Sequence, residues 1–134
     1  MILVTGASGL VGSAVLACFR DTGTNVVGTC HTRCRDGLTP LDLTDPLCVS
    51  RFFSGRDIHR IIHCSAVIPA NLPSNKAEQA YEANLFMIQN LVSAIGPQTG
   101  FTFISTTALY DLTGTARLTE QDGLCPITPY QESK

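Results

Sequence analysis

The segment VTGASGLVG, residues 4–12, constrains the fold more than any other part of the sequence. It follows the apolar run MILVT, residues 1–5, which predicts a buried strand, and it opens a helical pattern over residues 10–22. Glycine permits a tight reversal of the chain, close approach of a ligand to the backbone, and close packing of a helix on a sheet. The segment supplies it at a regular spacing, with Gly6, Gly9 and Gly12.

This glycine-rich turn predicts a binding site for the diphosphate of a dinucleotide. The first N–H groups of the following helix lack partners within the helix, and the helix dipole is positive at that end, so both favour a phosphate. A P-loop is excluded because no Gly-Lys-Ser/Thr sequence follows. A purely structural tight turn is the alternative, but the context of a strand before the turn and a helix after it favours dinucleotide binding.

The rest of the chain alternates strand-like and helical patterns. Strands are predicted over residues 25–30, 38–43, 57–66 and 101–106, and a short helix over residues 45–54, with Asp45 as N-cap and Pro46 at its first position. Such alternation is typical of an α/β fold, a doubly wound parallel sheet with helices on its faces. We expect one domain over residues 1–134.

A longer helix is predicted from a capping box of Asn75 and Glu78 to the Gly96-Pro97 stop. Its buried stripe is predicted at residues 77, 81, 84, 85, 88, 91, 92 and 95, and that of the first helix at residues 11, 14, 15, 18 and 19. Position 84 is asparagine, a polar side chain that must find partners if it is buried. Residues 110–129 are predicted to form a loop.

Composition excludes several classes of protein. The net charge of −2 and the pI of 5.8 argue against nucleic acid as a partner, and no run of about 18 apolar residues is present to enter a membrane. CHTRC places Cys30, His31 and Cys34 near each other, which could suggest a zinc site, but a fourth ligand at a suitable spacing is missing, so no metal is predicted. The six cysteines are interpreted as reduced thiols of a cytoplasmic protein.

Five motifs occur in a fixed order: TGxxGxxG, LDLTD, HCSA, FISTTALYD and Tyr-x-x-x-Lys. Together they resemble the extended short-chain dehydrogenase/reductase family. GTCHTR, GLTPLDLTDP and TEQDGLCPITPYQESK are most similar to the dTDP-4-dehydrorhamnose reductase group, which also includes the regulatory subunit of methionine adenosyltransferase. The resemblance spans essentially the whole chain. It implies an NAD(P)-binding Rossmann fold, truncated after strand five, with the substrate-binding C-terminal part absent.

The resemblance also implies which residues bind the dinucleotide. In dinucleotide folds an acidic residue at the end of strand two selects NAD, but Cys30 stands there. Arg33 and Arg35 follow and are suited to a 2′-phosphate, so NADP(H) is favoured over NAD(H), although both arginines could simply be solvated. The implied cofactor-binding residues are Gly6, Ser8, Gly9, Leu10, Val11, Gly12, Arg33, Asp42, Leu43, Cys64, Ser65, Ala66, Tyr130 and Lys134.

Four residues match the catalytic set of the family. Thr106 would orient the substrate carbonyl, and Tyr130 would donate a proton to its oxygen. A free tyrosine has a pKa of about 10, and a lysine one helical turn away lowers it, which is the implied role of Lys134 beside binding the nicotinamide ribose. Asn84 matches an asparagine that organises a water near the lysine. Three of them also have a plainer interpretation: Thr106 as a strand threonine, Tyr130 as a surface tyrosine, and Asn84 as an amide that caps backbone groups.

The expected function is NADP-dependent reduction of a keto group on a nucleotide-sugar such as dTDP-4-dehydrorhamnose, with hydride from NADPH and the proton from Tyr130. The alternatives are a non-catalytic NADP-binding regulatory subunit, an NAD-dependent epimerase or dehydratase, and a fragment without an independent role. Tyr130 and Lys134 lie in what would be the first turn of a helix, and a single turn is unstable alone. We therefore expect the 134-residue chain to be inactive or nearly so by itself.

Overall fold

The computed structural model describes residues 1–68, 76–110 and 117–134, which form two compact units. The first unit comprises Met1–Ala66 and Phe86–Ile104 and contains the whole sheet. The second unit comprises Val67–Leu85 and Ser105–Lys134. Helix α3, Ala77–Ala94, begins in the second unit and ends in the first.

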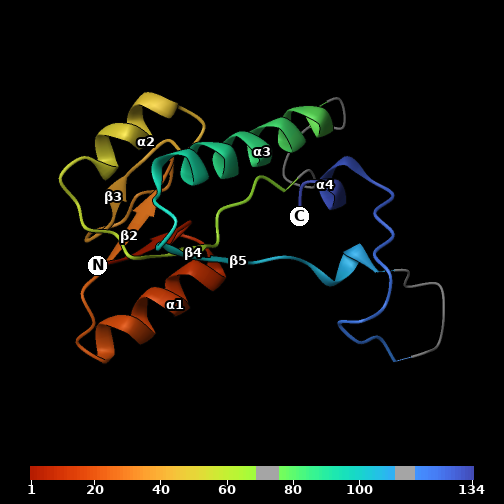
Figure 1. Cartoon of the computed structure of the whole chain (residues 1–134), viewed down its shortest axis with the longest axis horizontal. Helices are drawn as coiled ribbons and strands as arrows, with labels where there is room; N and C mark the ends of the chain where they lie inside the picture. Colours follow the sequence, from red (N-terminus) through yellow and green to blue (C-terminus); the bar gives the residue numbers. More distant parts are fainter. Residues whose placement is uncertain (69–75, 111–116) are drawn as a thin grey trace. The chain divides into compact units, whose positions relative to one another are not determined.

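The first unit is built on a five-stranded parallel sheet with the order β3-β2-β1-β4-β5 (Figure 1). The strands are β1 Ile2–Thr5, β2 Val26–Cys30, β3 Thr39–Pro40, β4 Arg60–His63 and β5 Gly100–Phe103. Helix α1, Leu10–Asp21, lies on one side of the sheet, and α2, Pro46–Phe53, lies on the other. This confirms the predicted doubly wound α/β Rossmann-type fold.

Strands β2 and β3 lie on one side of β1, and β4 and β5 lie on the other, so the strand order reverses between β1 and β4. In open parallel sheets such a reversal leaves a crevice at the carboxyl ends of the strands, where ligands bind. The glycine-rich turn leaves β1 at this end, and residues 64–66 leave β4 beside it. The topology therefore brings two of the predicted cofactor-binding segments to one edge of the sheet.

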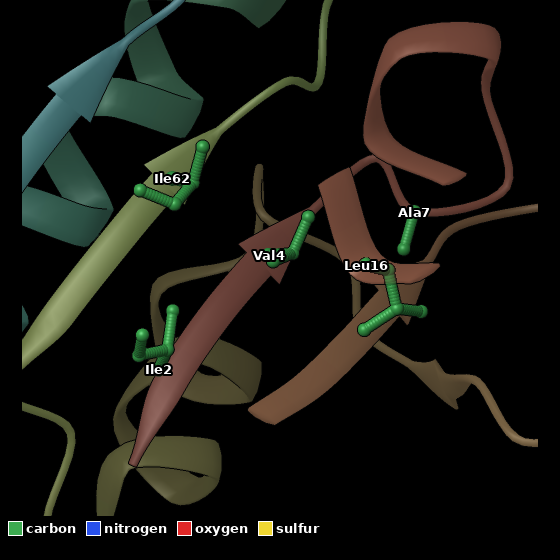
Figure 2. Close-up of a cluster of buried hydrophobic side chains, with 5 residues drawn as sticks. All are labelled: Ile2, Val4, Ala7, Leu16 and Ile62. Atoms are coloured by element: carbon green, nitrogen blue, oxygen red, sulfur yellow. The ribbon is translucent and has the colours of Figure 1, made fainter. Parts of the chain in front are cut away.

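Strand β1 is buried along its whole length, which explains its uninterrupted apolar sequence. Figure 2 shows part of the core around it, in which side chains from β1, the turn, α1 and β4 pack together. The five buried members of this cluster are Ile2, Val4, Ala7, Leu16 and Ile62. The turn is thus fixed by core packing on both of its sides.

The buried faces of α1 and α3 differ in part from the buried stripes predicted for these two helices. In α1 the buried positions are Gly12 and Leu16, whereas Val11 is about half exposed and Cys18 is exposed. A count of apolar side chains misses Gly12, whose lack of a side chain is what allows the close approach. In α3 the buried face contains Ala80, Asn84, Met87 and Leu91.

The α3 prediction is confirmed for Asn84 and Leu91 and wrong for Val92, which is 52% exposed. Asn75, which the sequence predicts to form a capping box with Glu78, lies outside the described residues. Strands are shorter than predicted, and β5 ends at Phe103 rather than at Thr106. The N-cap prediction for α2 is confirmed.

Asp45 caps α2 through its side chain. Its Oδ1 accepts hydrogen bonds from the amides of Leu47 and Cys48, at 2.8 and 3.3 Å, and Pro46 occupies the first turn. The hydrogen bond from the Cys48 thiol, together with those amides, lowers the pKa of the Asp45 carboxyl. The cap therefore stays ionised at neutral pH.

Two cysteines are joined where reduced thiols were predicted. Cys30 and Cys34 form a disulfide, so the prediction is wrong for this pair. The chain turns back directly after β2 and brings the two Cα atoms to 5.3 Å, a separation that disulfides span. The turn that closes this distance is a tertiary feature that cysteine spacing alone does not predict. The other cysteines, all within the described ranges, form no disulfide: Cys18, Cys48, Cys64 and Cys125.

Within the described ranges, no three His, Cys, Asp or Glu side chains gather closely enough to hold a metal ion. None of the helices in these same ranges is long and apolar enough to cross a membrane.

Candidate functional site

The first glycine of the turn occupies a conformation that other residues avoid. Gly6 has a φ of +63°, in the left-handed region. A Cβ atom there would lie 2.8 Å from the Ser65 amide nitrogen and 2.9 Å from the Cys64 carbonyl carbon. These are backbone atoms that no rotamer change can move. The β1–α1 turn therefore lies directly against the segment that follows β4.

The third glycine is required by packing within the turn itself. A Cβ on Gly12 would lie 2.3 Å from the Gly6 carbonyl oxygen. Gly9 is less confined, because the nearest atom to its Cβ would be the same oxygen at 3.3 Å. Gly9 is the N-cap of α1 and has no side chain to cap the helix. The first amides of α1, on Leu10, Val11 and Gly12, lack intrahelical partners, as the beginning of any helix does, and suit an anionic ligand.

A buried threonine ties the turn to the end of β4. Thr5 Oγ1 accepts hydrogen bonds from the amides of Cys64 and Ser65, at 3.2 and 3.3 Å. It also shares a hydrogen bond of 2.8 Å with His63 Nδ1. Thr5 and His63 are both almost fully buried. Thr5 is not among the predicted site residues, although a hydroxyl that ends an apolar strand just before a glycine is a signal.

The residues predicted near the adenosine lie on the chain that follows β2 and β3. Asp42 Oδ1 accepts hydrogen bonds from the Thr44 amide and hydroxyl, at 2.9 and 2.7 Å. The Thr44 hydroxyl is the main cause that lowers the pKa of Asp42. His31 Nε2 lies 3.6 Å from Asp42 Oδ2. Leu43 is buried, and its carbonyl oxygen accepts a 2.9 Å hydrogen bond from Asn90 Nδ2.

Arg33 and Arg35 lie in the loop after β2, and both are exposed. Neither guanidinium is in an ion pair with any residue that the structure describes. Two cations in an exposed loop at the end of β2 fit the predicted interaction with a 2′-phosphate, and they fit simple solvation equally well. The geometry leaves this prediction for experiment.

Two short segments of the second unit are held side by side. Helix α4, Pro129–Glu132, carries Tyr130, and the 3-10 helix η3, Thr107–Leu109, follows Thr106. Gln131 Nε2 donates a 2.7 Å hydrogen bond to the Ala108 carbonyl oxygen. Ser105 Oγ donates one of 2.9 Å to the carbonyl oxygen of Lys134. The structure therefore brings together the segments that contain three of the predicted catalytic residues.

Thr106 differs from its predicted place in a strand. Its backbone is still extended, but its Oγ1 accepts a 3.3 Å hydrogen bond from the Ala108 amide and so caps η3. Because the strand ends at Phe103, Thr106 lies beyond it and the two-residue alternation of strand faces does not extend to this position. The sequence pattern could not predict this change, because residues 104–106, with the sequence IST, continue the apolar and β-branched pattern of the strand.

Asn84 has found the partners that its burial requires. Its side chain is 3% exposed, its Oδ1 accepts from the Val67 amide at 2.8 Å, and its Nδ2 donates to the Val67 carbonyl oxygen and to Ser133 Oγ, both at 3.1 Å. Ser133 Oγ in turn donates a 2.7 Å hydrogen bond to the Tyr130 carbonyl oxygen. This chain of contacts connects Asn84 with the segment that holds Tyr130 and Lys134.

Ser133 and Gln131 were not selected from the sequence. Ser133 is 4% exposed, and Gln131 both forms a capping box with Thr128 and bonds to Ala108. A capping box of Thr and Gln three residues apart is a signal that the sequence does carry. It explains how a helix of only four residues is stabilised, by side chains rather than by length.

Asn84→Ala is expected to lower the free energy of unfolding by about 1–3 kcal/mol, because it leaves the part-buried amide and carbonyl of Val67 without their partner and removes one of the two hydrogen bonds of the Ser133 hydroxyl. Amide hydrogen exchange at Val67 should accelerate in step. Asn90→Ala is the matched control, since it removes one amide side chain from the same helix that makes a single hydrogen bond, to Leu43. Equal destabilisation by both variants would contradict a special role for Asn84.

A family model described as "NAD dependent epimerase/dehydratase family" matches residues 2–134. Among curated proteins, the methionine adenosyltransferase 2 subunit beta of Xenopus laevis is 29% identical over 134 residues. That alignment covers 98% of this chain and 40% of the relative, so the chain spans about two fifths of the length of that protein.

Two solved structures share the fold along nearly the whole chain. A short-chain dehydrogenase/reductase superfamily protein from Agrobacterium tumefaciens, crystallised with bound NAD, is 28% identical, with a TM-score of 0.83 over 100% of this chain and 42% of its own. A hypothetical dTDP-4-dehydrorhamnose reductase from Sulfolobus tokodaii is 25% identical, with a TM-score of 0.82 over 98% of this chain and 48% of its own.

Proposed function

The chain belongs to the NAD dependent epimerase/dehydratase family, and from this we propose that it binds NADP(H) and serves the reduction of a keto group on a nucleotide-activated sugar. The observation that carries the proposal is the turn at Gly6 and Gly12, where backbone atoms fill the space of any side chain. A turn built this way lets a diphosphate reach the free amides at the start of α1. The bound NAD of the Agrobacterium relative supports it.

The remaining binding roles follow the order of the segments along the sheet edge. Asp42, held ionised by Thr44, and Leu43 are proposed to contact the adenine side of the dinucleotide. Cys64, Ser65 and Ala66 are proposed to lie under the ribose and diphosphate, since Thr5 fixes the first two against the turn. Arg33 is proposed to bind the 2′-phosphate.

The dinucleotide, when bound, supplies the hydride. The residues of the chain supply the rest: Tyr130 gives a proton to the carbonyl oxygen, Lys134 stabilises the phenolate that remains, and Thr106 orients the carbonyl. Asn84 is a positioning residue, because it holds Ser133, which bonds to the Tyr130 backbone. The hydrogen bond from Gln131 to Ala108 supports this set of roles, since it keeps the Tyr130 helix beside the Thr106 segment.

The substrate class is the less direct part of the proposal. It is supported by the likeness to the hypothetical dTDP-4-dehydrorhamnose reductase, at 25% identity. Deuterium transfer tests it: the natural polypeptide that carries this chain is incubated with 4-deuterated NADPH and a nucleotide-activated keto sugar. Deuterium on the new alcohol carbon is expected. Retention of all deuterium in the cofactor, by a protein that binds NADPH, would overturn the proposed reduction.

A second candidate is a non-catalytic regulatory subunit, which the Xenopus relative favours. It predicts nucleotide binding without hydride transfer, and co-purification with a methionine adenosyltransferase. An NAD-dependent epimerase or dehydratase predicts instead that NADH binds at least as tightly as NADPH. The deuterium experiment, together with the NADPH and NADH affinities, distinguishes the reductase, the regulatory subunit and the epimerase or dehydratase from one another.

Arg33→Ala is expected to weaken NADPH binding about 10- to 100-fold, because a charge-assisted hydrogen bond contributes about 1.5–3 kcal/mol. NADH affinity should stay within about twofold, since NADH carries no 2′-phosphate to lose a partner. Arg51→Ala is the matched control, because it removes the same charge from an exposed position on α2. Equal losses for NADPH and NADH in Arg33→Ala would contradict recognition of the 2′-phosphate by this residue.

A further inference from the structure

The disulfide stands at the position that selects the cofactor. Cys30 ends β2, where an acidic residue selects NAD in dinucleotide folds. Its bond to Cys34 closes a ring that contains His31, Thr32 and Arg33. A ring of this size restricts the backbone of every residue within it. The arginine proposed to bind the 2′-phosphate therefore lies inside a covalently closed loop.

The same loop is held again at its far end. Gly37 has a φ of +78°, and its carbonyl oxygen accepts a 2.7 Å hydrogen bond from Arg20 Nη2 on α1. The Leu38 amide donates a 3.1 Å hydrogen bond to the Arg35 carbonyl oxygen. Residues 30–38 are thus fixed at two points, one covalent and one by hydrogen bonds. When the disulfide is reduced, the loop that carries Arg33 is held beyond β2 only by the hydrogen bonds at its far end, at Gly37 and Leu38.

We propose that Cys30 and Cys34 form a reversible redox site whose oxidised state favours the binding of NADP(H) over NAD(H). The proposal rests on the proposed function, since it needs Arg33 to meet the 2′-phosphate. In the oxidised loop the backbone of Arg33 is already ordered, so binding costs less conformational entropy. In the reduced loop that ordering must occur on binding, and the 2′-phosphate loses part of its advantage.

Exposure determines which sulfur reacts. Cys34 is exposed, whereas Cys30 is 2% exposed. The thiolate of an external dithiol therefore attacks Cys34 Sγ, the bond between the two protein sulfurs breaks, and Cys30 leaves as a thiolate and takes up a proton. The second thiol of the reductant then displaces Cys34 and closes its own disulfide. Two electrons and two protons pass from the dithiol to the protein.

Two further cysteines of the first unit lack these features. Cys48 is hydrogen-bonded to Asp45, and this contact raises the pKa of its thiol, which lowers its reactivity. Cys18 is exposed on α1 and forms no disulfide. Cys18→Ser therefore serves as a control that removes an exposed thiol and leaves the loop intact.

The test compares NADPH and NADH affinities of the oxidised chain, the chain reduced with dithiothreitol, and Cys34→Ser and Cys18→Ser. Alkylation in denaturant without reductant should label four cysteines in the oxidised chain, the ones outside the disulfide. Reduction should weaken NADPH binding about 2- to 10-fold, the range for ordering one long side chain and its loop, and leave NADH within about twofold. Cys34→Ser should match the reduced chain in either condition, and Cys18→Ser should match the parent chain.

Three results would overturn the inference, and they differ in their consequences for the proposed function. Labelling of all six cysteines without reductant would mean that no disulfide forms. Equal NADPH affinity in both redox states would remove the regulatory role and leave the proposed function intact. Absence of binding of either nucleotide, in a chain that is folded and shows the disulfide by alkylation, would remove the proposed function and the effect on affinity together.

Discussion

Gly12→Ala lowers the free energy of unfolding by about 1–3 kcal/mol, the usual cost of forcing extra volume into a packed site, and removes measurable dinucleotide binding. The added methyl group would lie 2.3 Å from the Gly6 carbonyl oxygen and 2.7 Å from its carbon. Relief requires the start of α1 to move away from the turn. The amides proposed to hold the diphosphate then lose their alignment, so affinity falls more than stability.

The measurement is urea unfolding of the variant, followed by nucleotide titration under conditions where it remains folded. Gly96→Ala is the control, because a Cβ at that position meets no atom within 4 Å and the backbone does not require glycine. It should resemble the parent chain in both assays. If Gly12→Ala binds NADPH as the parent chain does, the turn cannot be the diphosphate site.

Tyr130→Phe is expected to slow hydride transfer to a keto sugar about 10²- to 10⁴-fold, the contribution of a positioned general acid. The reason is that phenylalanine keeps the ring and its packing but has no proton to give. The contacts that place α4 beside η3 come from Gln131 and Ser105, so the variant should retain its fold. NADPH affinity should change little by comparison.

The rate is followed by transfer of deuterium from 4-deuterated NADPH in the natural polypeptide that carries this chain. Tyr81→Phe removes the same hydroxyl from a partly buried position on α3 and should leave the rate close to that of the parent chain, because Tyr81 has no part in the proposed chemistry. A Tyr130→Phe rate equal to that of Tyr81→Phe would contradict the general-acid role. It would also direct attention to the regulatory alternative.

Local signals in the sequence predicted the features that local chemistry determines. The apolar run before Gly6, the glycine spacing, and the Asp45-Pro46 start of α2 each act over a few residues, and each reappears in the structure. The parallel sheet followed from the alternation of elements, because a chain that alternates strand and helix can bury both only in this way. Asn84 was recognised as an unusual polar residue on a buried face, and burial is confirmed.

Features that depend on distant segments were not predictable in the same way. Val92 is as apolar as Leu91, and only the placement of α3 against its neighbours decides which of the two is buried. The end of β5 at Phe103 depends on the contacts of η3, and the Cys30–Cys34 bond depends on a turn after β2. Ser133 is a small polar residue whose importance arises from Asn84, 49 positions earlier in the chain.

The central claim is that the backbone amides of the glycine-rich turn hold the diphosphate of a pyridine nucleotide. The direct measurement is calorimetric titration of NADPH and NADH into the chain, with circular dichroism to establish that the sample is folded. The account predicts saturable binding at one site, with NADPH tighter than NADH, and its loss in Gly12→Ala. A folded sample that binds neither nucleotide would contradict it.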